Sequence, residues 1–170
     1  STAVGPVPNL SGIGALALGP NGNLRWGRVY GGPLNQAQDS AAGIALDAKG
    51  GVYVAGTSNT DGSNDFTILK YSAANGQPLW ETFYGTVPGL SDYAAGIAVT
   101  PDGAGVFVTG QSRMNANNFN AEDYATVRLN GTTGQKVWAK LYNGPGNSGD
   151  YAQSIALAAN GDVYVTGYSW

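Results

Sequence analysis

The sequence predicts an all-β fold of short antiparallel strands, and three observations lead to it. Apolar residues alternate with polar ones over many short segments, as at Val52 and Val54, which is typical of half-buried strands, and helical spacing is nowhere sustained. Dipeptides of Asn or Asp with Gly separate these segments, and their glycines supply the positive φ of hairpin turns. These dipeptides are Asn21-Gly22, Asn75-Gly76, Asp102-Gly103, Asn130-Gly131 and Asn160-Gly161.

The third observation is that one unit occurs three times in the chain. Residues 41–57 (AAGIALDAKGGVYVAGT), 94–111 (AAGIAVTPDGAGVFVTGQ) and 152–168 (AQSIALAANGDVYVTGY) match one another. A second match aligns three Trp-x-x-x-Tyr segments, with Trp26, Trp80 and Trp138 followed by Tyr30, Tyr84 and Tyr142. A sheet of four short strands cannot bury both of its faces alone, so repeated units of this kind stack as the four-stranded antiparallel blades of a β-propeller.

The repeat divides the chain unevenly if the Gly-Ile-Ala strand is the innermost strand of each blade. Residues 1–10 are then an extended N-terminal arm, since Pro6 and Pro8 do not suit a central strand. The β-propeller repeat domain spans 11–170, with an outer half-blade at 12–30, whole blades at 41–84 and 94–142, and an inner half-blade at 152–168. Three units are too few for a closed ring of about four to eight blades. We expect the complementary half-blades at the two ends to be completed by a partner.

Three stretches resemble the bacterial β-propeller repeat called SBBP, which combines a Trp-Tyr-Gly strand, a Gly-Ile-Ala-Val-Asp strand and a Tyr-Val-Thr-Gly strand. They are GIALDAKGGVYVAGTS, DFTILKYSAANGQPLWETFYG and DYATVRLNGTTGQKVWAKLYNGPGNSGDYAQSIALAANGDVYVTGYS. The resemblance covers residues 11–170. Two features depart from the pattern: Asp47 aligns with Thr100 and Ala158 in the other units, and the opening GIGALALG lacks an aromatic and a basic residue. It implies a propeller fold and a secreted or surface location, and it implies a fold far more than an activity.

Composition excludes several function classes. Charged residues make up 11% of the chain, and 8 basic against 11 acidic residues give a net charge of −3 with no basic stripe, so nucleic acid is not an expected partner. The chain has no His and no Cys, which removes the commonest general base and every thiolate or disulfide site. No apolar run approaches the length of a membrane span. We expect a protein that is not an enzyme and needs no cofactor.

Acidic residues offer two candidate cation sites. Asp39, Asp92 and Asp150 stand just before the inner strand of each unit and either gather around a central axis or accept backbone N–H groups in a turn. The stretch NTDGSND contains Asp61 and Asp65 as calcium candidates, although it lacks the twelve-residue spacing and terminal Glu of an EF-hand loop. The neighbouring Glu122 and Asp123 would face opposite sides of a strand, which makes a poor acid and base pair.

Aromatic residues and sequons suggest contact with carbohydrate. Trp26, Trp80 and Trp138 could stack on sugar rings, or they could pack against the next blade. Asn9 and Asn130 begin glycosylation sequons.

The sequence therefore favours a non-enzymatic, extracellular or cell-surface structural or scaffold protein that assembles with itself. Its products would be a head-to-tail filament or a closed six-bladed dimer. Two alternatives stay open, a carbohydrate-binding propeller and a piece of a longer secreted propeller. The residues expected to serve assembly are Val4, Val7, Leu10, Ile13, Leu16, Leu18, Ile155, Val163, Val165 and Trp170.

Overall fold

The computed structural model describes residues 12–32, 39–117 and 122–170. Within these ranges the chain forms β-strands and no helix, which confirms the predicted all-β class. In chain order the strands are β1 (Ile13–Leu18), β2 (Leu24–Tyr30), β3 (Ser40–Leu46), β4 (Gly51–Asn59), β5 (Asn64–Ser72), β6 (Pro78–Tyr84), β7 (Asp92–Val99), β8 (Gly105–Arg113), β9 (Glu122–Asn130), β10 (Lys136–Tyr142), β11 (Asp150–Leu157) and β12 (Val163–Ser169).

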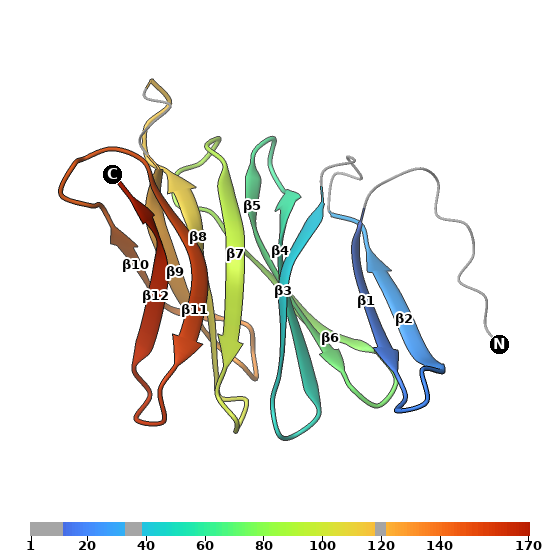
Figure 1. The fold of residues 1–170 in the computed structure, drawn as a ribbon. Coiled ribbons are helices and arrows are strands. Elements are labelled where there is room, and N and C mark those ends of the chain that lie inside the picture. Colours follow the sequence, from blue (N-terminus) through green and yellow to red (C-terminus); the bar gives the residue numbers. More distant parts are fainter. Residues whose placement is uncertain (1–11, 33–38, 118–121) are drawn as a thin grey trace.

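The strands form antiparallel sheets of two sizes. Two sheets have four strands each, in the orders β3-β4-β5-β6 and β7-β8-β9-β10, and they have the strand order of propeller blades. Two smaller sheets pair only β1 with β2 and β11 with β12. Figure 1 shows the sheets standing in a row, with β1 and β2 at one end, β11 and β12 at the other, and β3, β7 and β11 side by side along one face.

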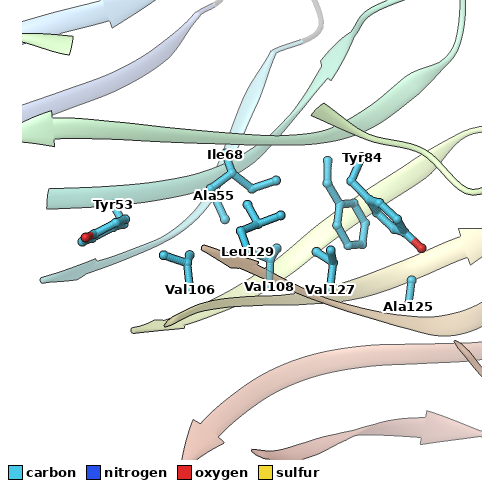
Figure 2. Close-up of a cluster of buried hydrophobic side chains, with 10 residues drawn as sticks. Tyr53, Ala55, Ile68, Tyr84, Val106, Val108, Ala125, Val127 and Leu129 are labelled. Carbon is cyan, nitrogen blue, oxygen red and sulfur yellow. The ribbon is translucent and has the colours of Figure 1, made fainter. Parts of the chain in front are cut away.

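The main hydrophobic core lies between the two four-stranded sheets (Figure 2). Its members alternate along the strands because only one face of each strand points to the neighbouring sheet. Burial of each large apolar side chain contributes about 1.5–3 kcal/mol. The core contains Tyr53, Ala55, Phe66, Ile68 and Tyr84 from the first four-stranded sheet, and Val106, Val108, Ala125, Val127 and Leu129 from the second.

A second core lies between the β1–β2 sheet and the other face of β4 and β5. It contains Ile13, Ala15, Trp26, Val52, Val54, Leu69 and Tyr71. Both faces of β4 are therefore covered, and its residues are buried without interruption from Gly51 to Ser58. This differs from the half-buried strand that alternation predicts there, because alternation in one strand does not show how many neighbours a sheet has.

The turns follow the predicted glycines with one exception. Gly22, Gly76, Gly103 and Gly161 have positive φ. The prediction for Gly131 is wrong, since the positive φ in that turn, 74°, belongs to Gly134. The Gly134 N–H donates to the Asn130 carbonyl at 2.8 Å, and the Asn130 side chain accepts the N–H groups of Thr132 and Thr133. The turn is thus longer than a two-residue hairpin loop.

Candidate functional site

At each end of the row of sheets, one strand has a single partner among the described strands, although its counterparts in the four-stranded sheets pair on both sides. In the four-stranded sheets the second strand pairs on both sides, as β4 does with β3 and β5. In the β11–β12 sheet the second strand, β12, pairs only with β11, and at the other end β1 pairs only with β2. An unpaired edge exposes backbone N–H and C=O groups that can pair with another strand.

The pairing registers show which positions in different sheets are equivalent. Tyr30, Tyr84 and Tyr142 lie opposite Ile13, Phe66 and Tyr124, which aligns β1–β2 with the outer strand pairs β5–β6 and β9–β10. Leu46, Val99 and Leu157 lie opposite Val52, Val106 and Val163, which aligns β11–β12 with the inner pairs β3–β4 and β7–β8. We call residues at equivalent positions counterparts.

Apolar side chains are exposed on β1 and β3 at the N-terminal end of the row. Leu16 and Leu18 on β1 are 59% and 56% exposed, whereas their β9 counterparts Val127 and Leu129 are fully buried. Ile44 on β3 is 55% exposed. The residues of β1 on the opposite face are covered by the chain's own core, and Ile13, expected to serve assembly, is fully buried there. Its side chain is not part of the exposed surface.

A matching apolar surface is exposed at the C-terminal end. Tyr164 on β12 is 60% exposed, although its counterparts Tyr53 and Phe107 are buried in the four-stranded sheets. There Tyr53 packs against Trp80 and Phe107 against Trp138, with ring centroids 6.0 and 5.9 Å apart. Tyr168 and Trp170 are also exposed.

A cavity of about 450 Å³ lies beside the free edge of β12. Its floor comes from β9 and β10, and Val163 and Val165 of β12 line its wall. In the preceding sheets this position beside the second strand is filled by β5 or β9. The residues on the floor are Tyr124, Thr126, Lys140, Leu141 and Tyr142.

Tryptophan side chains join each sheet to a turn of the next. The indole N–H of Trp26 donates to the Ala73 carbonyl at 2.9 Å, and that of Trp80 donates to the Gly131 carbonyl at 3.2 Å. The third member of the set, Trp138, makes no such bond to any described residue. Trp26 is 6% exposed, so its ring is covered by packing.

Basic side chains accompany these contacts. The ammonium group of Lys70 also donates to the Gly131 carbonyl, at 2.7 Å, and lies 4.8 Å from the ring centroid of Tyr53. Its counterpart Arg128 lies over the ring of Phe107, and its buried Nε atom has no hydrogen-bond partner in the part of the chain that the structure describes. Arg128, Tyr164 and Tyr168 are not among the site residues that the sequence predicts, although an alignment of the repeats by their pairing register identifies all three.

Asp39, Asp92 and Asp150 are buried, and each accepts a backbone N–H from the loop before it. The donors are Gly32 at 2.6 Å, Thr86 at 2.8 Å and Gly144 at 2.6 Å. These bonds hold the loop that leads from an outer strand to the next inner strand. Burial raises the pKa of Asp92 above its usual range.

The calcium candidates are engaged in local hydrogen bonds. Asp61 accepts the N–H and the hydroxyl of Ser63, and the hydroxyl bond lowers its pKa. Asp65 accepts the hydroxyl of Thr60, and burial raises its pKa. In the ranges that the structure covers, no three acidic side chains lie close enough together to hold a metal ion.

Glu122 and Asp123 are engaged separately. Glu122 accepts the Tyr151 hydroxyl at 3.2 Å and lies 3.5 Å from the Arg113 guanidinium. Burial, followed by the charge of Asp150, raises the pKa of Asp123. Asn130 is exposed, and Asn9 lies outside the described residues together with Val4, Val7 and Leu10.

Comparison with protein families gives one match. Residues 26–62 match the model of the SBBP β-propeller repeat, from Trp26 on β2 to Gly62 beyond β4, which confirms the resemblance. A comparison with curated proteins finds no match. Among the described residues there is no helix of the length and apolar character needed to cross a membrane.

Proposed function

We propose that this chain, which carries an SBBP β-propeller repeat at residues 26–62, is a non-enzymatic structural protein that assembles with copies of itself. The β11–β12 sheet of one copy and the β1–β2 sheet of the next would join into one four-stranded blade. Each copy then contributes three blades' worth of strands, two of them whole and one divided between its ends.

The observation that carries this proposal is the complementarity of the two small sheets. By register, β1 and β2 are counterparts of the third and fourth strands of a four-stranded sheet. By the same criterion, β11 and β12 are counterparts of the first and second strands. Each small sheet therefore supplies the pair that the other lacks, in the order that a complete blade requires.

The exposed side chains support the same proposal. Joining the two sheets would bring Leu16 and Leu18 of one copy to the cavity beside β12 of another. Exposed apolar clusters of this kind mark interaction sites, and their burial favours association. Repetition of the contact gives a closed six-bladed dimer if the rotation between copies closes, and a head-to-tail filament if it does not.

The proposal includes an extracellular or cell-surface location. Its support is compositional, since the chain is rich in the uncharged residues Asn, Ser, Thr and Gly.

The first test is the mass and shape of the purified particle, measured by light scattering on a sizing column and by negative-stain microscopy of the same sample. We expect a discrete dimer or filaments. The variant Leu16→Asp should give smaller particles because it places a charge in the joined blade. The control Leu79→Asp changes an equally exposed residue on β6, away from both free edges, and should leave the assembly unchanged.

A well-folded monomer at every concentration would contradict the proposal. It would favour the alternative in which further strands of a longer chain complete the two small sheets. Binding of a glycan by the monomer, lost on substitution of Trp80 or Trp138, would instead favour a carbohydrate-binding propeller.

A further inference from the structure

We propose that β12 of one copy pairs with β1 of the next in a single register, with Val165 opposite Leu16, and that Trp138 and Arg128 fix this register by binding the Pro20 carbonyl of the next copy. This inference rests on the proposed function. It adds which atoms meet at the joint and what prevents the two strands from sliding.

The two four-stranded sheets supply the register. Val54 lies opposite Leu69 in the first sheet, and Val108 lies opposite Val127 in the second. Val165 is the counterpart of Val54 and Val108, and Leu16 is the counterpart of Leu69 and Val127. The joined blade should therefore pair Val165 with Leu16, and by the same rule Val163 with Leu18.

Side-chain faces make a one-residue slip costly. Successive residues of a strand point to opposite faces of the sheet. Moving either strand by one position would therefore place each of its side chains opposite a residue that points to the other face. Leu16 and Leu18 point away from the chain's own core, whereas Ile13 and Ala15, on the other face of β1, are buried in it. In the proposed register the two leucines lie on the face that carries Val163 and Val165, toward the cavity floor formed by β9 and β10.

The tryptophan contacts identify the second half of the joint. Ala73 and Gly131, which accept the indole bonds of Trp26 and Trp80, each lie two residues after a β5 or β9 residue that is buried, Tyr71 or Leu129. Leu18 is the counterpart of Tyr71 and Leu129 on β1, and the residue two positions later is Pro20. The Trp138 indole, which has no partner among the described residues, is thus placed to donate to the Pro20 carbonyl of the next copy.

Arg128 should reinforce this contact. Its counterpart Lys70 donates to the same Gly131 carbonyl that accepts the Trp80 indole. The Arg128 guanidinium forms no hydrogen bond with the described residues, its buried Nε atom included, and a buried donor without a partner costs free energy. A carbonyl provided by the next copy would accept a charge-assisted hydrogen bond from its terminal nitrogens.

Pro20 also makes the joint different from the contacts inside the chain. The N–H groups of Ala73 and Gly131 donate to the carbonyls of Gly50 and Ala104, both at 2.9 Å, and so fasten the turn to the inner half of its own sheet. Proline has no N–H, so the joined blade lacks this bond. Its turn is held to the neighbouring copy through the Pro20 carbonyl instead. Trp138 and Arg128 therefore supply a larger part of the contacts that hold this turn than Trp80 and Lys70 do inside the chain.

Cysteine cross-linking tests the register directly, because the natural chain has no Cys. One preparation carries Leu16→Cys and the other Val165→Cys, and the two are mixed and oxidised. Opposite residues of antiparallel strands have Cβ atoms about 4.5–5.5 Å apart, close to disulfide distance. We expect a disulfide-linked dimer for this pair. Ala17→Cys with Val165→Cys is the matched control, which the proposed register places on opposite faces and which should not cross-link.

A hydrogen-bond variant tests the second half of the proposal. Trp138→Phe keeps an aromatic ring against Phe107 but removes the N–H donor, and we expect association to weaken roughly three- to tenfold, as for one hydrogen bond. The control Trp80→Phe removes the equivalent bond inside the chain. It should lower the melting temperature and leave association of the folded chain unchanged.

The outcomes separate this inference from the proposed function. Assembly with no cross-link between positions 16 and 165, or with an equal cross-link in the control pair, would overturn the register and leave self-assembly standing. Assembly that Trp138→Phe does not weaken would overturn the contact with Pro20. Absence of assembly in the natural chain would overturn the proposed function together with this inference.

Discussion

The indole nitrogen of Trp26 and the carbonyl oxygen of Ala73 are 2.9 Å apart, although 47 residues separate them in the chain. The bond joins the β1–β2 sheet to the turn at the end of β5. The Trp26 ring also packs beside Tyr71, with centroids 6.4 Å apart. One side chain thus contributes both apolar packing and a hydrogen bond between two sheets that share no strand pairing.

Substitution of Trp26 should loosen the β1–β2 sheet. Trp26→Phe removes the hydrogen bond and leaves a gap beside Tyr71, so we expect a loss of about 1–3 kcal/mol in the free energy of unfolding. Urea denaturation measures the loss, and amide hydrogen exchange should show it concentrated in β1 and β2. Trp138→Phe is the comparison, since its ring has no such bond in the separate chain and should destabilise it less. Equal losses of unfolding free energy for the two variants would mean that the Trp26 hydrogen bond does not stabilise the β1–β2 sheet.

The core between the two four-stranded sheets should be the most sensitive region of the molecule. Phe66 is fully buried there and packs against Tyr84 with ring centroids 5.7 Å apart. We expect Phe66→Ala to cost about 3–5 kcal/mol, since it removes apolar contact and leaves a cavity. Phe83→Ala, a change on the partly exposed neighbour of Tyr84, should cost much less in the same denaturation experiment. A similar cost for both would mean that the core does not lie where the structure has it.

Much of the fold follows from the sequence because its signals are local. The repeat and the alternation predict short antiparallel strands, and most turn glycines adopt the predicted φ. The error at Gly131 arises because Asn130-Gly131 begins its turn, whereas Asn75-Gly76 ends an equivalent turn of the same length. The positive φ belongs to the end of the turn, where Gly76 and Gly134 stand. Burial of a side chain depends instead on contacts between residues far apart in the sequence. Ile13 looks like an edge residue in the sequence, yet its Cδ1 atom occupies space left by Gly56 on a different sheet.

The candidate site was predictable in outline and not in its contacts. The uneven phase of the repeat points to free edges at both ends of the chain. The role of Trp138 and Arg128 depends on hydrogen bonds between neighbouring sheets, and no pattern within one repeat contains that information. Asp47 is a different case, because its replacement by Thr100 looks like a departure from the repeat although both residues serve the same local turn. The Asp47 carboxylate accepts the Gly51 N–H at 2.7 Å, and the Thr100 hydroxyl accepts the Gly105 N–H at 2.9 Å in the equivalent turn.

Asp47 should therefore matter for stability although it is only partly buried. Its carboxylate also accepts the Lys49 N–H and the hydroxyl of the buried Tyr53, at 2.8 Å each. We expect Asp47→Ala to lower the free energy of unfolding by about 1–2 kcal/mol, because the turn and the Tyr53 hydroxyl lose their acceptor. Asp47→Thr should recover part of the loss by copying Thr100. Failure of the threonine variant to differ from the alanine variant in thermal denaturation would show that the two turns are not equivalent.

Two neighbouring carboxyl groups should make stability depend on pH. Asp65 and Asp92 both have a pKa raised above the usual 3.8, chiefly by burial, and the charges of Asp61 and then Asp92 add to the effect on Asp65. Gly85 lies between them, since a Cβ atom there would be 2.3 Å from Asp65 Oδ1 and 3.3 Å from Asp92 Oδ2. A raised pKa means that the folded chain holds protons more tightly than the unfolded chain. The contribution of these groups is therefore most favourable below the usual pKa and is lost as pH rises through the raised values.

Asp65→Asn removes one of the two charges and keeps an oxygen that can accept the Thr60 hydroxyl. At neutral pH we expect this variant to be more stable than the natural chain, and the difference should shrink as the pH falls toward 4 because Asp65 then becomes protonated. The quantity to compare is the difference in unfolding free energy between the variant and the natural chain. Asp61 and Asp102 have lowered pKa values, so in both proteins they make stability rise with pH and their contribution cancels in the difference. Urea denaturation at a series of pH values measures it. A difference that stays constant with pH, or grows as the solution is acidified, would mean that the Asp65 carboxyl group does not have the raised pKa its burial beside Asp92 requires.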